Sequence, residues 1–257
     1  MRSTRALPLI LSLCWCSVVA CGGDDGGSSK GEQTTETDVP QEPHEVACTD
    51  ESVTKLTLFD QEPSDAEVIN DAQDEGFLTE VDTTGGALSP IESFVYLKFT
   101  DDGLKLVEVN DEDAFESVDW DIAARRFVLR LNSGVSGPGW VKAGRTAPET
   151  KFESVDEVPD DLELRAEEYF SEDCTFLADA GIGSATTVLS SFWSYMACVE
   201  MTHNVYIIEV DRPKKRHVKL EVMTYYLPDR QQICDDTGMV PTPSGAGHLT
   251  LRWAFID

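Results

Sequence analysis

Histidine and methionine can bind metal ions through nitrogen or sulfur, and they are unevenly distributed along this 257-residue chain. No histidine or methionine lies between His44 and Met196. Those available to a folded domain lie in the last quarter of the sequence: Met196, Met201, His203, His217, Met223, Met239 and His248. A bound metal centre would therefore find its imidazole and thioether ligands in this C-terminal part of the chain.

His203 is the strongest single ligand candidate, since it precedes a predicted strand and has Met201 close by. Two ligands that bind a metal from opposite faces must point toward each other, whereas residues two apart on a strand point the same way. Met201 and His203 are therefore not expected to form such a pair. Workable pairs join His203 to another segment, at Met223, Met239 or His248. The competing interpretation is that methionines beside aromatic residues simply fill a core.

The N-terminal segment has the features of an export signal. Arg2 and Arg5 precede an apolar stretch over 6–20 that is too short to cross a membrane. Its end, Val18-Val19-Ala20-Cys21, resembles a bacterial lipobox, and that resemblance implies a diacylated Cys21, with palmitate among the acyl chains. An ordinary secretory signal is the alternative. We expect a signal peptide over 1–20, a flexible acidic, Gly/Ser-rich tether over 21–47 and a single domain over 48–257.

Four of the seven cysteines lie in the predicted domain: Cys48, Cys174, Cys198 and Cys234. An even number of cysteines in an exported domain predicts two disulfides, with three possible connectivities. A zinc site is disfavoured because there is no CxxC pair and the spacings are long.

Charge excludes other classes of partner. The chain carries 48 Asp and Glu against 20 Lys and Arg, a net charge of −28. Such a surface disfavours nucleic acids and anionic lipid headgroups. The main exception is a basic segment, which is either a solvated hairpin tip or a docking site for an acidic group: Arg212, Lys214, Lys215 and Arg216.

Other motifs carry little signal. Gly181-Ile182-Gly183 begins like a dinucleotide-binding loop but lacks the third glycine, so a turn is predicted. The carboxylates of 110–113 are spaced unlike a calcium loop and predict a solvated turn. No nucleophile and base come together in the sequence, so catalysis is not expected.

Apolar residues alternate with polar ones along most of the domain. This period of two predicts a hairpin over 94–109 with a turn at 101–103, and strands over 122–131, 205–210, 218–222 and 249–255. Short helices are candidates over 64–74 and 158–170. The predicted fold class is all-β, mainly antiparallel.

Three runs resemble the HmuY family of bacterial lipoproteins. They are Ser93-Phe94-Val95-Tyr96-Leu97, Val118-Asp119-Trp120-Asp121-Ile122-Ala123, and the stretch from Arg126 to Gly134. The C-terminal runs at 193–195, 206–208, 218–220 and 225–226 agree. The resemblance implies an all-β fold and a carrier at the outer membrane, on its periplasmic face or at the cell surface. Such a carrier holds haem between two side chains and passes it to an outer-membrane receptor.

We therefore expect an envelope-anchored protein that binds haem or a related tetrapyrrole without catalysis. The alternative is a binding or interaction module of the same fold that does not ligate haem iron.

Overall fold

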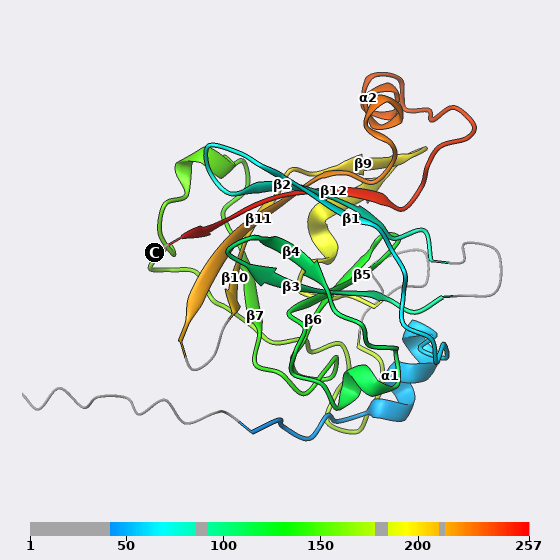
Figure 1. Ribbon diagram of the computed structural model, residues 1–257, viewed down its shortest axis with the longest axis vertical. Helices are drawn as coiled ribbons and strands as arrows, with labels where there is room; N and C mark the ends of the chain where they lie inside the picture. The colour runs from blue at the N-terminus through cyan, green and yellow to red at the C-terminus, as the bar shows by residue number, and fades with distance from the viewer. Residues whose placement is uncertain (1–41, 86–91, 178–184, 211–213, 257) are drawn as a thin grey trace, which may run out of the picture. The chain divides into compact units, whose positions relative to one another are not determined.

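The computed structural model describes residues 42–85, 92–177, 185–210 and 214–256. The predicted signal peptide, Cys21 and most of the predicted tether lie outside these ranges. The described chain is built mainly of antiparallel sheets, with two short α-helices, as Figure 1 shows. The all-β prediction is confirmed.

The larger sheet has six strands, and each neighbouring pair is antiparallel. In spatial order the strands are β1 (Val68–Ala72), β2 (Phe77–Asp82), β12 (His248–Ile256), β11 (Arg216–Thr224), β10 (Val205–Val210) and β7 (Lys142–Arg145). The predicted strands at 205–210, 218–222 and 249–255 are confirmed within β10, β11 and β12.

The second sheet has four strands, in the order β4 (Gly103–Leu106), β3 (Val95–Thr100), β5 (Ile122–Arg125) and β6 (Val128–Leu131). The predicted hairpin is present as β3 and β4. Its turn needs Gly103, which has φ +123°, because a Cβ there would lie 2.6 Å from the side chain of Asn70. The single strand predicted over 122–131 was wrong, because Arg126 adopts φ +53° and turns the chain back into a β5–β6 hairpin.

Both predicted helices were also wrong. Residues 68–72 of the first form β1, because pairing with β2 satisfies their backbone groups. Residues 158–170 contain no helix, and Leu162 and Leu164 instead pack on the six-stranded sheet with a period of two. The observed helices are α1 (Thr49–Leu56) and α2 (Pro228–Thr237). The described residues also contain three single 3-10 turns: η1 (Asp113–Phe115), η2 (Phe152–Ser154) and η3 (Ser190–Phe192).

The main core lies between the two sheets. The inward residues of β3, β5 and β6 form one cluster with those of β2, β10, β11 and β12. Trp253 is fully buried at its centre, where its indole N–H donates to Thr79 Oγ1 at 2.9 Å and the Phe99 ring packs edge-on at 5.0 Å. Burial of these alternating residues fixes the register of both sheets.

Two further clusters cover the outer faces. Segment 152–164 packs on the six-stranded sheet, where the buried Lys219 ammonium donates to the carbonyls of Phe152 at 3.1 Å and Val155 at 2.8 Å. On the four-stranded sheet, α1 covers Phe94 and Tyr96. Segment 152–164 therefore covers part of the outer face of the six-stranded sheet. The candidate site lies on that face beside the start of this segment.

Charged groups are also buried beside the four-stranded sheet. Arg130 is 0% exposed and donates to Ser136 and to the Tyr96 hydroxyl. Glu167 accepts backbone N–H bonds from Leu131 and Val188, each at 2.9 Å, and its burial raises its pKa to about 7. These groups tie the loops after β6 and β7 to the sheet.

Two disulfides join distant parts of the chain, Cys48–Cys174 and Cys198–Cys234. The first fixes the start of α1 to a loop 126 residues away. The second fixes α2 to the short hairpin of β8 (Trp193–Tyr195) and β9 (Val199–Met201). Two disulfides were predicted, and the structure selects one of the three connectivities.

Within the described residues, no helix combines the length and apolar character required to cross a lipid bilayer.

Candidate functional site

His203 lies just after β9 and not on a strand. β9 ends at Met201, and His203 has φ +53°, a left-handed conformation that is uncommon for a residue with a side chain. The argument that Met201 and His203 point the same way therefore does not apply. Met201 is buried in the core, whereas the His203 side chain is 52% exposed.

The His203 ring is oriented by Glu221 of β11. Its Nδ1 lies 2.9 Å from Glu221 Oε1, and this contact is the main cause that raises the His203 pKa. No hydrogen bond to Nε2 of His203 is found among the described residues. A histidine held by a carboxylate at Nδ1 presents Nε2 as a ligand, and this pairing is common beside metal-bound histidines.

His203 lines a cavity of ≈ 280 Å³ on the outer face of the six-stranded sheet. Met223 lines the same cavity, at a shift in the β11–β12 register between Val222 and Thr224. Such irregularities commonly redirect a side chain. The other lining residues are Glu149, Thr150, Lys151, Phe152, Glu153, Thr202, Glu221 and Arg252.

Arg252 organises the charges of this cavity. Its Nη1 lies 2.6 Å from Glu153 Oε1 and 4.0 Å from Glu221 Oε2, and its guanidinium stacks 4.2 Å from the centre of the Phe152 ring. Hydrogen bonding to Arg252 lowers the pKa of Glu153. A continuous chain of charged contacts thus runs from Glu153 through Arg252 and Glu221 to His203.

The structure brings together one of the predicted ligand pairs, His203 with Met223. Met201, Met239 and His248 do not line this cavity. Met239 is 68% exposed beyond α2, and His248 opens β12 and lines a separate cavity of ≈ 100 Å³. These placements make His203 and Met223 the pair to test first.

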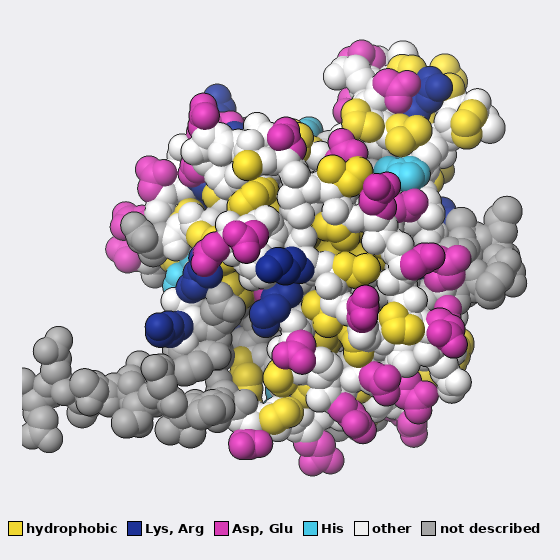
Figure 2. Space-filling model, viewed as in Figure 1, with side chains coloured by type: hydrophobic (Ala, Val, Ile, Leu, Met, Phe, Trp, Pro, Cys, Tyr) yellow, Lys and Arg dark blue, Asp and Glu magenta, His cyan; other side chains and the backbone are white. Residues whose placement is uncertain are grey.

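The predicted anion-docking segment is already engaged with carboxylates. Arg216 pairs with Asp101 at 2.6 Å and stacks on the Phe255 ring, and Lys215 pairs with Glu209 at 3.5 Å. Lys214 is exposed, and Arg212 lies outside the described residues. Figure 2 shows Lys and Arg side chains gathered near the middle of one face, among scattered carboxylates.

The predicted glycine-rich turn at 181–183 also lies outside the described residues. The turn at 110–113 is described, and it is not wholly solvated as predicted. Asp111 is fully buried, where it accepts hydrogen bonds from the Phe94 N–H at 2.9 Å and the Tyr96 hydroxyl at 2.8 Å.

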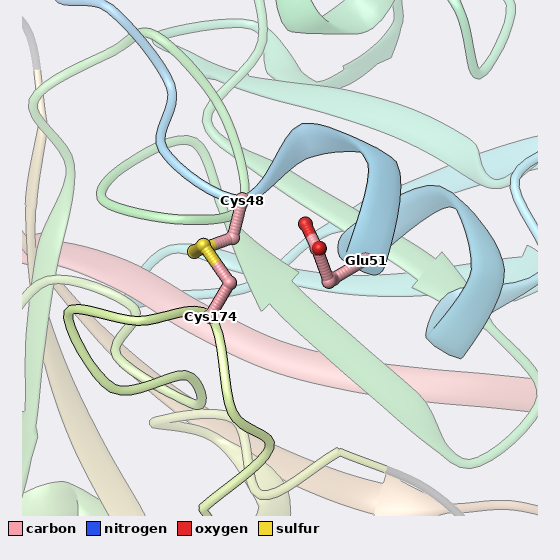
Figure 3. Close-up of side chains that lie close together, drawn as sticks. All are labelled: Cys48, Glu51 and Cys174. Carbon is pink, nitrogen blue, oxygen red and sulfur yellow. A yellow bond between two sulfur atoms is a disulfide. The ribbon is translucent and has the colours of Figure 1, made fainter.

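One cluster has the composition of a soft-metal site. Cys48, Glu51 and Cys174 have ligand atoms within 4.8 Å of one another. Figure 3 shows the three side chains beside the start of α1. Both sulfurs are joined in the disulfide, so neither is available as a thiolate. The described part of the chain holds no other such group of three histidine, cysteine or carboxylate side chains.

Sequence reasoning missed the residues that orient His203. Glu221 and Lys219 alternate with the apolar residues Val218, Leu220 and Val222, and this strand pattern does not indicate a partner for His203. Glu221 is 8% exposed as a residue. Arg252 and Phe152 reach the cavity from segments about a hundred residues apart, which local periodicity cannot reveal.

No protein-family model matches the chain, and no curated protein matches it. Among solved structures, it is similar to the crystal structure of the apo HmuY analog of Tannerella forsythia. The two are 14% identical, the match covers 76% of this chain and 100% of the other, and the TM-score is 0.40.

Proposed function

We propose that this protein is a carrier of the bacterial cell envelope that binds haem or a related tetrapyrrole without chemical turnover. The observation that carries the proposal is the 2.9 Å contact between His203 Nδ1 and Glu221 Oε1, in a cavity shared with Met223. Imidazole nitrogen and thioether sulfur are both established ligands of haem iron. The iron would supply the coordination bonds that hold the group.

The side chains around the cavity have separable tasks in this proposal. Glu221 holds the imidazole ring and favours the tautomer with its proton on Nδ1, which leaves the Nε2 lone pair for the metal. Lys151 and Arg252 are the two basic lining residues and would meet acidic groups at the edge of the ligand. Arg252 would divide its charge between such a group and Glu153, which it already contacts.

The size of the cavity bears on how such a ligand would sit. Sites that enclose a drug-sized ligand have volumes of roughly 300–1,000 Å³. A cavity of ≈ 280 Å³ is slightly smaller than that range. It would accept the ligated part of a flat macrocycle and leave the remainder open to another protein, as suits a carrier that must release its cargo.

The envelope location rests on two features. The lipobox-like segment ending at Cys21 supports a lipid anchor in the outer membrane, with the tether connecting it to the domain. The two disulfides support an oxidising compartment. An outer-membrane receptor would be the partner that accepts the cargo.

A second candidate function is a binding module that ligates no iron. One observation favours it: the chain Glu153–Arg252–Glu221–His203 is complete without a ligand. A protonated His203 would then serve only as the partner of Glu221.

Titration of the purified protein with hemin separates the two functions. A carrier is expected to shift the Soret band and give defined Q bands, in the ferric or the ferrous state. His203→Ala should weaken binding at least about tenfold, which corresponds to about 1.4 kcal/mol. His217→Ala is the matched control. His217 lies on β11, as Glu221 does, and its Nε2 is 3.7 Å from a carboxylate oxygen of Glu209.

Met223→Leu keeps the volume of the side chain and removes the sulfur. A changed spectrum in this variant would identify Met223 as the second ligand, whereas an unchanged one would exclude it. The absence of a Soret shift in both redox states would reject haem binding. A shift that His203→Ala leaves intact would reject the assigned ligand.

A further inference from the structure

Another cavity lies where α1 and the segment after it meet η1. Its volume is ≈ 430 Å³, larger than that of the His203 cavity, and the two share no residue. Its lining comes from two parts of the chain: Thr49, Asp50, Val53, Leu58, Phe59 and Gln61 from the first, and Glu112, Phe115 and Glu116 from the second.

The inner wall of this cavity is apolar. Leu58 is 3% exposed, and Val53 and Phe115 pack against the same cluster that α1 covers on the four-stranded sheet. Phe59 completes the wall but is 63% exposed. Burial of an exposed phenylalanine against a ligand recovers a large apolar contribution, so Phe59 is well placed to close over an occupant.

The rim of the cavity is acidic. Asp50, Glu112 and Glu116 line it, and no lysine or arginine among the described residues does. Lys55, the basic residue of α1, has its ammonium 3.9 Å from the centre of the Phe176 ring and does not line the cavity. Three carboxylates around a low-dielectric wall concentrate a negative potential at the opening.

Hydrogen bonds hold the rim in place without neutralising it. Gln61 Nε2 donates to Glu112 Oε2 at 3.4 Å, and Asn110 Nδ2 donates to the Gln61 carbonyl at 2.9 Å. The segment after α1 and the turn at 110–113 are thereby joined across the opening. Within the described part of the chain, no basic lining residue counters the carboxylate charge of the rim.

We propose that this cavity binds an organic cation, an ammonium or guanidinium group carried on an apolar body. The body would pack against Val53, Leu58 and Phe115, and the charge would lie among the rim carboxylates. Phe59 and Phe115 add aromatic faces, which attract cations. The same rim would repel anions, so this site is independent of the proposed tetrapyrrole site.

Three probes with one ring and different charge test the proposal: phenethylammonium, 2-phenylethanol and phenylacetate. Binding is followed by NMR through the methyl groups of Val53 and Leu58, which report on this cavity alone. The ammonium should bind at least about tenfold more tightly than the alcohol, and phenylacetate should not shift the methyl signals.

Variants assign the preference to named groups. Glu112→Gln with Glu116→Gln should reduce ammonium affinity about tenfold and leave the alcohol unchanged. Phe59→Ala, at a side chain that is 63% exposed, should weaken both. Glu108→Gln is the matched control, since Glu108 is exposed and does not line the cavity.

Two results would overturn the proposal: equal affinity for the ammonium and the alcohol, or no shift at Val53 and Leu58 with any probe. A capped Phe-Lys dipeptide distinguishes the natural sources of the cation. Binding as tight as that of phenethylammonium would identify a lysine of a protein segment, and binding of the small amine alone would identify a free amine.

Discussion

Nδ1 of His203 lies 2.9 Å from Oε1 of Glu221. His203 is in the loop after β9, and Glu221 is in β11, 18 positions further along the chain. The contact fixes the ring of a half-exposed histidine at the mouth of a cavity. It also couples the protonation of the ring to a largely buried carboxylate.

Glu221→Gln should lower the pKa of His203, because the hydrogen bond to this carboxylate is the main cause that raises it. In the folded protein the raised pKa stabilises the fold below the unfolded value of about 6.5. That contribution is lost as pH rises through the folded pKa. NMR titration of the His203 Cε1–H signal measures the shift.

Asp235→Asn is the matched control, because Asp235 also raises the His203 pKa but contributes least among the causes. It should lower the pKa less than Glu221→Gln does. An equal or larger drop in this control would contradict the role given to Glu221.

Glu167 should make the protein less stable as pH rises. Its folded pKa of about 7 lies above the unfolded value, so the folded state retains a proton between about pH 4.5 and 7 that the unfolded state releases. The stabilisation is complete below the unfolded pKa and is lost as pH rises through 7, by at most about 3 kcal/mol. Glu167→Gln should flatten this dependence.

Urea unfolding of the wild type and Glu167→Gln at pH 5 and pH 8 measures the difference. The comparison with the variant is essential, because repulsion among the many other carboxylates also weakens the fold at high pH. Equal pH dependence in both proteins would show that Glu167 does not carry it.

Lys219→Met should destabilise the fold by about 3 kcal/mol, since the buried ammonium donates to the carbonyls of Phe152 and Val155 and both hydrogen bonds would be lost. It also contacts Glu75 and lies 4.5 Å from the centre of the Phe152 ring. Because Phe152 lines the His203 cavity, the variant should loosen that wall too.

The control for this prediction is Lys105→Met, at a side chain that is 59% exposed. Its free energy of unfolding should change by less than about 0.5 kcal/mol. Similar losses in the two variants would mean that removal of a positive charge, and not the buried contacts, is responsible.

Replacement of both Cys198 and Cys234 by alanine should cost about 4 kcal/mol, given the 36-residue separation that the disulfide closes. The protection of α2 amides from hydrogen exchange should fall more than that of β11, because the disulfide is the covalent link of α2 to the β8–β9 hairpin. A uniform loss of protection would contradict this local effect.

The sequence predicted the parts of the fold that depend on local alternation. In the β3–β4 hairpin and in β10, β11 and β12, apolar residues alternate with polar ones. The β5–β6 turn was missed because Arg126 adopts a left-handed conformation that its residue type does not indicate. The segment at 68–72 was assigned wrongly because its pairing partner β2, and not its own composition, decides its structure.

The candidate site was likewise predictable only in part. His203 could be singled out from its residue type and its place before a strand, and so could Met223. Their surroundings could not, because Phe152 and Arg252 come from opposite ends of the second half of the chain. The pairing of the disulfides likewise depends on which loops the sheets bring together.

The Cys48–Cys174 link has a mechanical consequence. A pull on the chain ahead of Cys48 is carried by covalent bonds to residue 174, so the strands β1 to β7 lie inside a closed loop and bear none of the load directly. These strands cannot be peeled from the sheets one after another from that end. A domain pulled through its N-terminal side would therefore resist unfolding of these strands for as long as this one bond stays oxidised.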